Sequence, residues 1–213
     1  MIMPASEARP NPRAARTREA LMEAGLRLFA ERPVDAVPID DIVAAAGVAK
    51  GSFFNHFRDK QHFANTIAAD IRRTIELQID AANAGLTDPL LRLAGGMTVA
   101  ARFALHEPDR TTVMLRGMAW ATGRDNPLNA GLRGDIEAAA ANGLLRPEAR
   151  AAGLLFWLGN CQMLMMNIVE RRFDVRQAAE RMREVMVMGL TGLGVKPDRA
   201  DEIARHCAEQ LSH

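Results

Sequence analysis

The 213-residue sequence contains no tyrosine, only two cysteines and almost no net charge. A formal charge of +1 at pH 7 gives no overall attraction to nucleic acid, so any such binding must depend on where the basic residues lie. Cys161 and Cys207 are far apart and match no metal-binding or redox spacing. This use of cysteine predicts a fold without disulfides in a reducing compartment, with no metal and no other cofactor.

Long apolar segments are also missing. No run reaches the roughly 18 consecutive apolar residues of a membrane helix, and the opening stretch MIMPASEARPNPRAARTR lacks the apolar part of a signal peptide. We therefore predict a cytoplasmic protein that does not interact with membranes. Catalytic motifs such as GxSxG, HExxH and the P-loop do not occur, so we predict no catalytic residues and no enzyme activity.

Apolar residues instead repeat at three- and four-residue steps along most of the chain, and no alternating strand pattern appears. Pro, Gly and Asp residues mark the helix boundaries, including Pro33, Pro38, Gly47 and the capping Asp59. We predict an all-α fold of about ten helices: three short ones before residue 58, a long one over about 59–84, and others over about 88–107, 108–123, 126–143, 147–171, 174–193 and 197–213.

Three short helices with a glycine-containing turn describe a helix-turn-helix domain, which we place at 16–60. Residues 1–15 are expected to form a flexible basic arm that leads to Arg16, a candidate DNA contact. The remaining residues, 61–213, are expected to form a larger helical domain.

The stretch GVAKGSFFNHFRDK, residues 47–60, combines aromatic side chains with long polar donors. Phe53 and Phe57 lie one helical turn apart and can face a small core formed with Leu21, Leu28, Ile42 and Val43. Lys50, Ser52, Asn55 and His56 then point outward on a helix that can enter the major groove. Gly51 allows close approach to a phosphate, and Lys60 can hold the flanking strand.

The run IDDIVAAAGVAKGSFFNHFRDK, preceded by TREALMEAGLRLFAE, resembles the N-terminal signature of TetR-type transcriptional regulators over residues 16–65. The resemblance implies a dimeric repressor that binds a palindromic operator and is released by a small-molecule effector. It maps the family's DNA contacts onto Lys50, Gly51, Ser52, Phe54, Asn55, His56 and Lys60. Base readout is expected from His56 or Asn55, with Lys50 also possible, and Lys60 is expected to anchor a phosphate.

The sequence departs from the family pattern at three positions. Phe54 replaces the usual tyrosine and has no hydroxyl to reach a phosphate. Ala49 and Pro38 replace residues that would cap the two helices of the motif. Basic and acidic residues are nearly balanced over residues 1–60, so we expect the acidic ones to lie away from the groove: Glu19, Glu23, Asp40 and Asp41.

The larger domain carries two apolar helices at about 147–171 and 174–193, and the resemblance implies that these form the dimer contact. Methionine, tryptophan and interleaved polar residues suggest a mostly apolar effector pocket. Its expected lining is Met97, Arg102, Phe103, His106, Met114, Met118, Trp120, Trp157, Asn160, Cys161, Met163 and Asn167. Ordinary core packing is the alternative for any one of these residues.

Two other functions remain open at this point. One is a DNA-binding factor that a protein partner controls. The other is an all-α carrier or enzyme with a vestigial helix-turn-helix. Glu202, His206 and Glu209 share one helix face, but a solvated face explains them better than a metal site.

Overall fold

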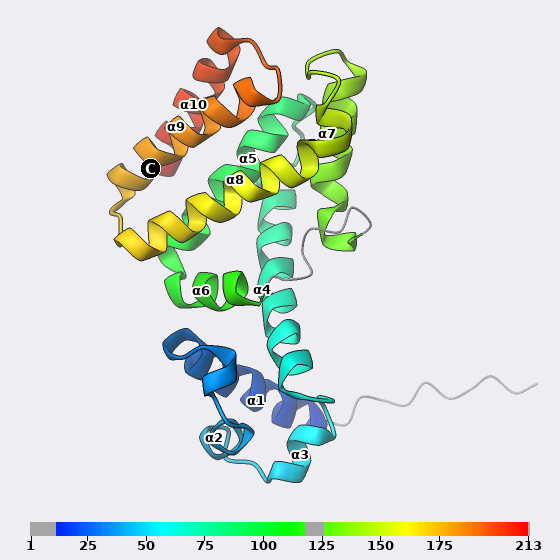
Figure 1. Cartoon of the computed structure of the whole chain (residues 1–213), viewed down its shortest axis with the longest axis vertical. Coiled ribbons are helices and arrows are strands. Elements are labelled where there is room, and N and C mark those ends of the chain that lie inside the picture. The colour runs from blue at the N-terminus through cyan, green and yellow to red at the C-terminus, as the bar shows by residue number, and fades with distance from the viewer. Residues whose placement is uncertain (1–11, 118–125, 213) are drawn as a thin grey trace, which may run out of the picture. The chain divides into compact units, whose positions relative to one another are not determined.

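The computed structural model describes residues 12–117 and 126–212, and in this part of the chain it is all α, with ten α-helices and no strand (Figure 1). The predicted fold class is therefore confirmed. The chain divides into two compact units between Ile67 and Ala68. This division falls inside helix α4 (Lys60–Ala82), a few residues beyond the predicted boundary at residue 60.

The first unit contains α1 (Pro12–Glu31), α2 (Ile39–Ala45), α3 (Lys50–Phe54) and the beginning of α4. Gly47 ends the turn after α2 with φ +66°, a left-handed conformation that glycine adopts without a Cβ clash. Asp59 caps α4, because its Oδ1 accepts from the His62 backbone N–H at 2.7 Å. This hydrogen bond lowers the pKa of the Asp59 carboxyl. Pro38 and Ala49 precede α2 and α3 without any side-chain cap, as their chemistry requires.

Phenylalanine rings fill the core of the first unit. Phe63 packs on Phe57 at 4.6 Å between ring centroids, on Phe53 at 5.2 Å and on Phe29 at 5.8 Å. All four rings are almost completely buried, and their edge-to-face and tilted arrangements are the favourable ones for aromatic pairs. Gly25 lets α1 approach this cluster, because a Cβ there would lie 2.4 Å from Phe63 Cζ. The inward placement of Phe53 and Phe57 is confirmed.

The second unit contains the rest of α4 and six further helices. They are α5 (Pro89–His106), α6 (Pro108–Arg116), α7 (Ala130–Ala141), α8 (Ala149–Arg171), α9 (Val175–Gly192) and α10 (Pro197–Ser212). Figure 1 shows α9 and α10 side by side, with α8 crossing α5. Asp88 caps α5, and Asp174 with Gln177 forms a capping box at the start of α9.

Helix α8 is long and apolar enough to cross a membrane by length and composition, and no other helix in the described residues is. Yet it packs against α5, α6, α7 and α9. Its buried side chains include Leu154, Trp157, Leu164 and Ile168. We therefore interpret α8 as the central helix of the second unit's core.

Two local expectations differ from the structure. Residues 12–15 belong to α1, so the arm does not extend to residue 15; the earlier arm residues lie outside the described part. Helix α3 ends at Phe54 and not at Phe57. The His56 N–H then donates to Phe53 O, three residues back, in the turn that leads to the cap at Asp59.

Candidate DNA-binding surface and effector cavity

The outer side of α3 carries the residues that the sequence analysis assigned to DNA. Lys50, Gly51, Phe54 and Asn55 are exposed. Ser52 is half-buried on the same helix. Phe54 is 52% exposed, whereas the adjacent Phe53 is fully buried. Phe53 therefore lies on the side of α3 that faces the core, and Phe54 lies on the side that faces solvent. Arg16 is exposed on α1.

His56 differs from the other candidates because it follows α3 instead of lying on it. Its ring is half-buried and lies 6.2 Å from the Phe57 ring, between centroids. Because His56 lies in the turn after α3, the conformation of this turn determines the direction in which the imidazole points.

Lys50 forms an ion pair with Asp40, 2.8 Å from Nζ to Oδ1. Asp40, which was expected to lie away from the groove, therefore lies beside a candidate DNA contact. Asp40 sits in the first turn of α2, ten residues before Lys50, and the turn between the helices brings the two ends together. Both side chains are more than half exposed, so the pair adds little stability and Lys50 can exchange this carboxylate for a phosphate. Asp41 contacts Arg32 instead.

Lys60 holds the connection between α1 and α2. Its Nζ donates to Asp35 O and to Val37 O, each at 3.0 Å. These carbonyls belong to the short 3₁₀ segment Val34–Ala36 and to Val37, the residue after it. They lie outside an α-helix, so they do not take part in the regular backbone hydrogen bonds of one. An ammonium has three N–H donors, so one remains after these two bonds.

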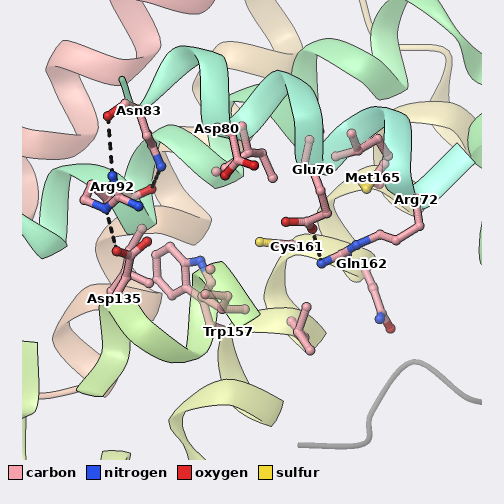
Figure 2. A pocket seen from close by; sticks show the side chains of 18 of the residues that line it. Arg72, Glu76, Asp80, Asn83, Arg92, Asp135, Trp157, Cys161, Gln162 and Met165 are labelled. Carbon is pink, nitrogen blue, oxygen red and sulfur yellow. Dashed lines mark hydrogen bonds and ion pairs between the residues drawn. The ribbon is translucent and has the colours of Figure 1, made fainter. Parts of the chain in front are cut away.

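A narrow cavity lies within the second unit (Figure 2). The space that the centre of a water molecule can reach is about 60 Å³, so the cavity admits only a small molecule without rearrangement. Helices α4, α5, α6, α7 and α8 all contribute to its walls. Its apolar lining includes Ile75, Ile79, Leu93, Met114, Leu132, Trp157, Leu158 and Met165.

Charged side chains line the same cavity in two pairs, and Figure 2 shows both. Arg72 pairs with Glu76 one turn along α4, and Arg92 of α5 pairs with Asp135 of α7. Arg92 also connects to Asn83, whose Nδ2 donates to the Arg92 carbonyl at 3.0 Å. The polar lining is therefore largely neutralised within the protein.

Burial changes the acidity of this lining. Desolvation raises the pKa of Glu76, with Arg72 opposing the shift and the nearby Asp80 adding to it. Desolvation likewise raises the pKa of Asp135, opposed by Arg92 and increased by Asp80. Burial raises the pKa of the Cys161 thiol to about 12, so this group is a neutral thiol in the cavity wall.

The structure brings only part of the predicted pocket to this cavity. Met114, Trp157 and Cys161 line it. Met97 and Phe103 are buried in α5 without lining it, while His106 is exposed. Arg102 lines a separate groove beside α10, where it donates to Gln210 O. Met118 and Trp120 lie outside the described residues.

The remaining predicted pocket residues, Asn160, Met163 and Asn167, line a shallow groove formed by α8 and α9. These helices expose several large apolar side chains to solvent: Leu155 by 58%, Phe156 by 42%, Met163 by 57% and Met188 by 73%. Large exposed apolar side chains can mark a site of interaction with another molecule.

The polar cavity residues were not predicted. They are Arg72, Glu76, Asp80, Asn83, Arg92, Asp135 and Gln162. A signal was present, because Arg72, Glu76 and Asp80 recur every four residues beside the apolar stripe of Ile71, Ile75 and Ile79. Such spacing also describes an ordinary solvated edge of an amphipathic helix, so only the packing of α5 and α7 distinguishes the two.

The first unit, with an exposed α3 following a tight turn after α2, defines a helix-turn-helix protein whose second unit is a separate helical fold. Residues 21–67 match the family model of bacterial regulatory proteins, tetR family. The match covers the N-terminal segment, and the predicted resemblance to this family is confirmed.

Curated relatives match the N-terminal region. A 70-residue segment is 40% identical to the HTH-type transcriptional repressor DhaR of Mycobacterium sp. (strain GP1), covering 31% of this chain and 35% of DhaR. A 52-residue segment is 40% identical to the transcriptional regulator AcuR of Cereibacter sphaeroides, covering 24% of each protein. The matched segments thus span about a third or less of these relatives.

Solved structures resemble nearly the whole chain. RolR in complex with resorcinol has a TM-score of 0.62 at 22% identity, over 90% of this chain and 94% of RolR. A gamma-butyrolactone receptor described as an ArpA-like protein has a TM-score of 0.61 at 21% identity, over 93% of this chain and 99% of the receptor. At these identities the similarity establishes the fold.

Proposed function

We propose that the protein is a dimeric transcriptional repressor that binds a palindromic DNA operator through α3 and releases it when a small molecule enters the second unit. The observation that carries this proposal is the exposed polar surface of α3 over a buried aromatic core, in a segment that matches the family model. Its relatives DhaR and AcuR are named as transcriptional regulators, which favours regulation over carriage or catalysis. A cytoplasmic location follows from this role.

On DNA, the outer side of α3 would enter the major groove. Gly51 has no atom within 4 Å of a Cβ position, so a phosphate could approach the backbone there. Asn55 and His56 would read base edges. Lys50 would exchange Asp40 for a phosphate, and Phe54 would contact a sugar or a thymine methyl.

The dimer would form through α8 and α9. A two-fold contact brings the same apolar face of each copy together, which would cover Leu155, Phe156, Met163 and Met188. Such a contact would also space two copies of α3 for successive major grooves.

Effector control would pass through α4. This helix contributes Phe63 and Ile67 to the core of the first unit and Arg72, Glu76 and Asp80 to the cavity of the second. A ligand that favours one position of α4 would change the separation of the recognition helices. A shift from 1% to 99% released requires about 5.5 kcal/mol of differential affinity.

DNA recognition is tested by selecting bound fragments from random DNA and sequencing them. We expect an inverted repeat. The variant His56→Ala should lose preference at one position of each half-site, by about 1–3 kcal/mol if the imidazole contacts a base. His206→Ala, a distant exposed histidine on α10, is the matched control. An unchanged base preference in His56→Ala would remove this residue from the reading role, and the absence of any enriched sequence would refute the proposal.

Dimerisation is tested by light scattering of the purified chain. Met188→Glu places a charge on the most exposed methionine of the α8–α9 face and should shift the protein toward monomer. Leu77→Glu, on α4 and 64% exposed, is the matched control and should leave the mass unchanged. Equal masses for both variants would place the dimer contact elsewhere.

A further inference from the structure

Three segments of the first unit meet beside the ring of Phe57. Figure 1 shows the beginning of α1 near the end of α3 and the beginning of α4. Each segment places one nitrogen-bearing side chain against this ring. The Arg18 guanidinium carbon lies 5.7 Å from the ring centroid, and the His56 and His62 rings lie at 6.2 and 6.1 Å between centroids. Because Phe57 is 2% exposed, it is a fixed support that holds these groups in one part of the surface.

Arg18 carries a positive charge that no carboxylate of the described residues neutralises. Four other cations of the unit are paired with carboxylates: Arg27, Arg32, Lys50 and Arg58. Arg18 is exposed, and its guanidinium lies over the Phe57 ring. A guanidinium that packs on an aromatic ring keeps the N–H groups at its edge free to bind a phosphate.

The sequence assigned the DNA contact of α1 to Arg16, two residues before Arg18. Side chains two positions apart on an α-helix project in directions about 200° apart. Because Arg18 projects toward Phe57, Arg16 projects to the other side of α1. Of these two arginines, Arg18 is the one beside α3 and the turn that follows it.

One hydrogen bond fixes the tautomer of His62. The backbone N–H of Arg58 donates to His62 Nδ1 at 3.3 Å, so Nδ1 is an acceptor and the proton of the neutral ring lies on Nε2. The His62 side chain is exposed, and its Nε2 forms no hydrogen bond with the residues that the structure describes. His62 therefore presents one N–H donor to solvent beside the same ring as Arg18.

Asp59 is the carboxylate nearest in sequence to His62, and both of its oxygens are already engaged. Oδ1 accepts from the His62 backbone N–H at 2.7 Å, and Oδ2 pairs with Arg58 Nε at 3.2 Å. Arg58 offsets the charge of Asp59, so the charge of Arg18 is left over. A phosphate has several acceptor oxygens and a negative charge, which suit a guanidinium and a neutral N–H donor together.

We propose that Arg18 and His62 form a site that binds the DNA backbone phosphates next to the bases that α3 reads. The inference rests on the proposed function and deepens it, because it adds two contacts to those of α3 and Lys60. Arg18 contributes a charge and His62 a neutral hydrogen bond. Since both contact phosphate, they position the protein on DNA without selecting a sequence.

The salt dependence of DNA affinity tests Arg18. The probes are a labelled duplex of the sequence enriched from random DNA and a labelled duplex of scrambled sequence. Arg18→Met keeps an aliphatic side chain against Phe57 and should weaken the log–log salt slope by about 0.9 units on both probes. Arg18→Lys retains the charge and should retain the slope.

Arg27→Met is the matched control, because Arg27 is further along α1 and is paired with Glu23. It should leave the salt slope unchanged. Equal slopes for Arg18→Met and Arg27→Met would overturn the Arg18 contact, as would a lowered slope in Arg18→Lys equal to that in Arg18→Met.

Two substitutions at one position test His62. In His62→Asn the amide oxygen can accept the Arg58 N–H in place of Nδ1, but no donor reaches the position of Nε2. In His62→Gln the longer amide can donate from that position. We expect His62→Asn to bind both probes about fivefold more weakly, the loss of one neutral hydrogen bond, with an unchanged salt slope. Equal affinities of the Asn and Gln variants would refute the role of Nε2.

The scrambled duplex separates this inference from the proposed function. If no sequence is enriched but Arg18→Met weakens the salt slope on the scrambled duplex, the phosphate site stands and the sequence-specific repressor falls. If a sequence is enriched and bound while the Arg18 and His62 variants behave as the original protein, the repressor stands and the phosphate site falls.

Discussion

Lys60 combines a structural role with a proposed DNA contact, and one substitution measures both. Lys60→Met keeps the aliphatic stem and removes the ammonium that bonds Asp35 O and Val37 O. A hydrogen bond with one charged partner contributes about 1.5–3 kcal/mol when buried. One of these two carbonyl contacts is exposed and the other is half-buried, so we expect the variant to lose about 2 kcal/mol in total.

Urea denaturation of the full-length chain measures this loss as a lower transition midpoint. Lys196→Met is the matched control, because Lys196 is exposed in the turn before α10 and belongs to the second unit. If the two variants unfold at the same urea concentration, the hydrogen bonds to the connector do not stabilise the first unit and the reasoning is refuted.

The same variant reports on the third N–H donor of Lys60. If this donor meets a phosphate, the dependence of DNA affinity on salt should weaken by about 0.9 units in the log–log slope. Gel shift at several salt concentrations gives the slope. An unaltered slope with reduced stability would leave Lys60 with the structural role alone.

Two further predictions concern the core and the cavity. Gly25→Ala should destabilise the first unit by about 1–3 kcal/mol, because the new Cβ would lie 2.4 Å from Phe63 Cζ in a closely packed phenylalanine cluster. Gly51→Ala is the control: no atom lies within 4 Å of its Cβ position, so it should not destabilise the unit in the same urea denaturation assay. Equal stability of the two variants would contradict the packing argument. Glu76 has a raised pKa, so the folded state holds its proton more tightly and the stability from this group falls as pH rises above about 4.5. The stability of Glu76→Gln relative to the original protein should therefore improve from pH 4.5 to pH 7, and a constant difference across that range would show that Glu76 titrates normally.

Much of the fold could be predicted because its signals are local. Asp59, Asp88 and Asp174 each precede a helix whose first free N–H groups need an acceptor, and all three cap the expected helix. Gly47 adopts the left-handed conformation that its place after α2 required. The inward placement of Phe53 and Phe57 also followed from helical spacing.

Errors arose where neighbours in space replaced neighbours in sequence. The spacing of His56 fitted a continuing helix, but α3 ends at Phe54 and the chain turns toward the cap of α4 at Asp59. Asp40 was expected to lie away from the groove, and the turn between α2 and α3 brings it beside Lys50, a candidate DNA contact.

The cavity of the second unit shows the same limit more strongly. Met97 and Trp157 are both buried apolar residues, and composition does not indicate that only Trp157 lines the cavity. The ion pair between Arg92 and Asp135 joins two helices across 43 positions of sequence, so no local sequence pattern could predict it.

The sequence by itself therefore determined the helices, their caps and the outward residues of the recognition segment, because these depend on interactions within a few positions. Only the tertiary structure decided which side chains surround the cavity and which charges neutralise one another there. Those choices depend on how five helices cross, and the crossing is set by the packing of the whole core.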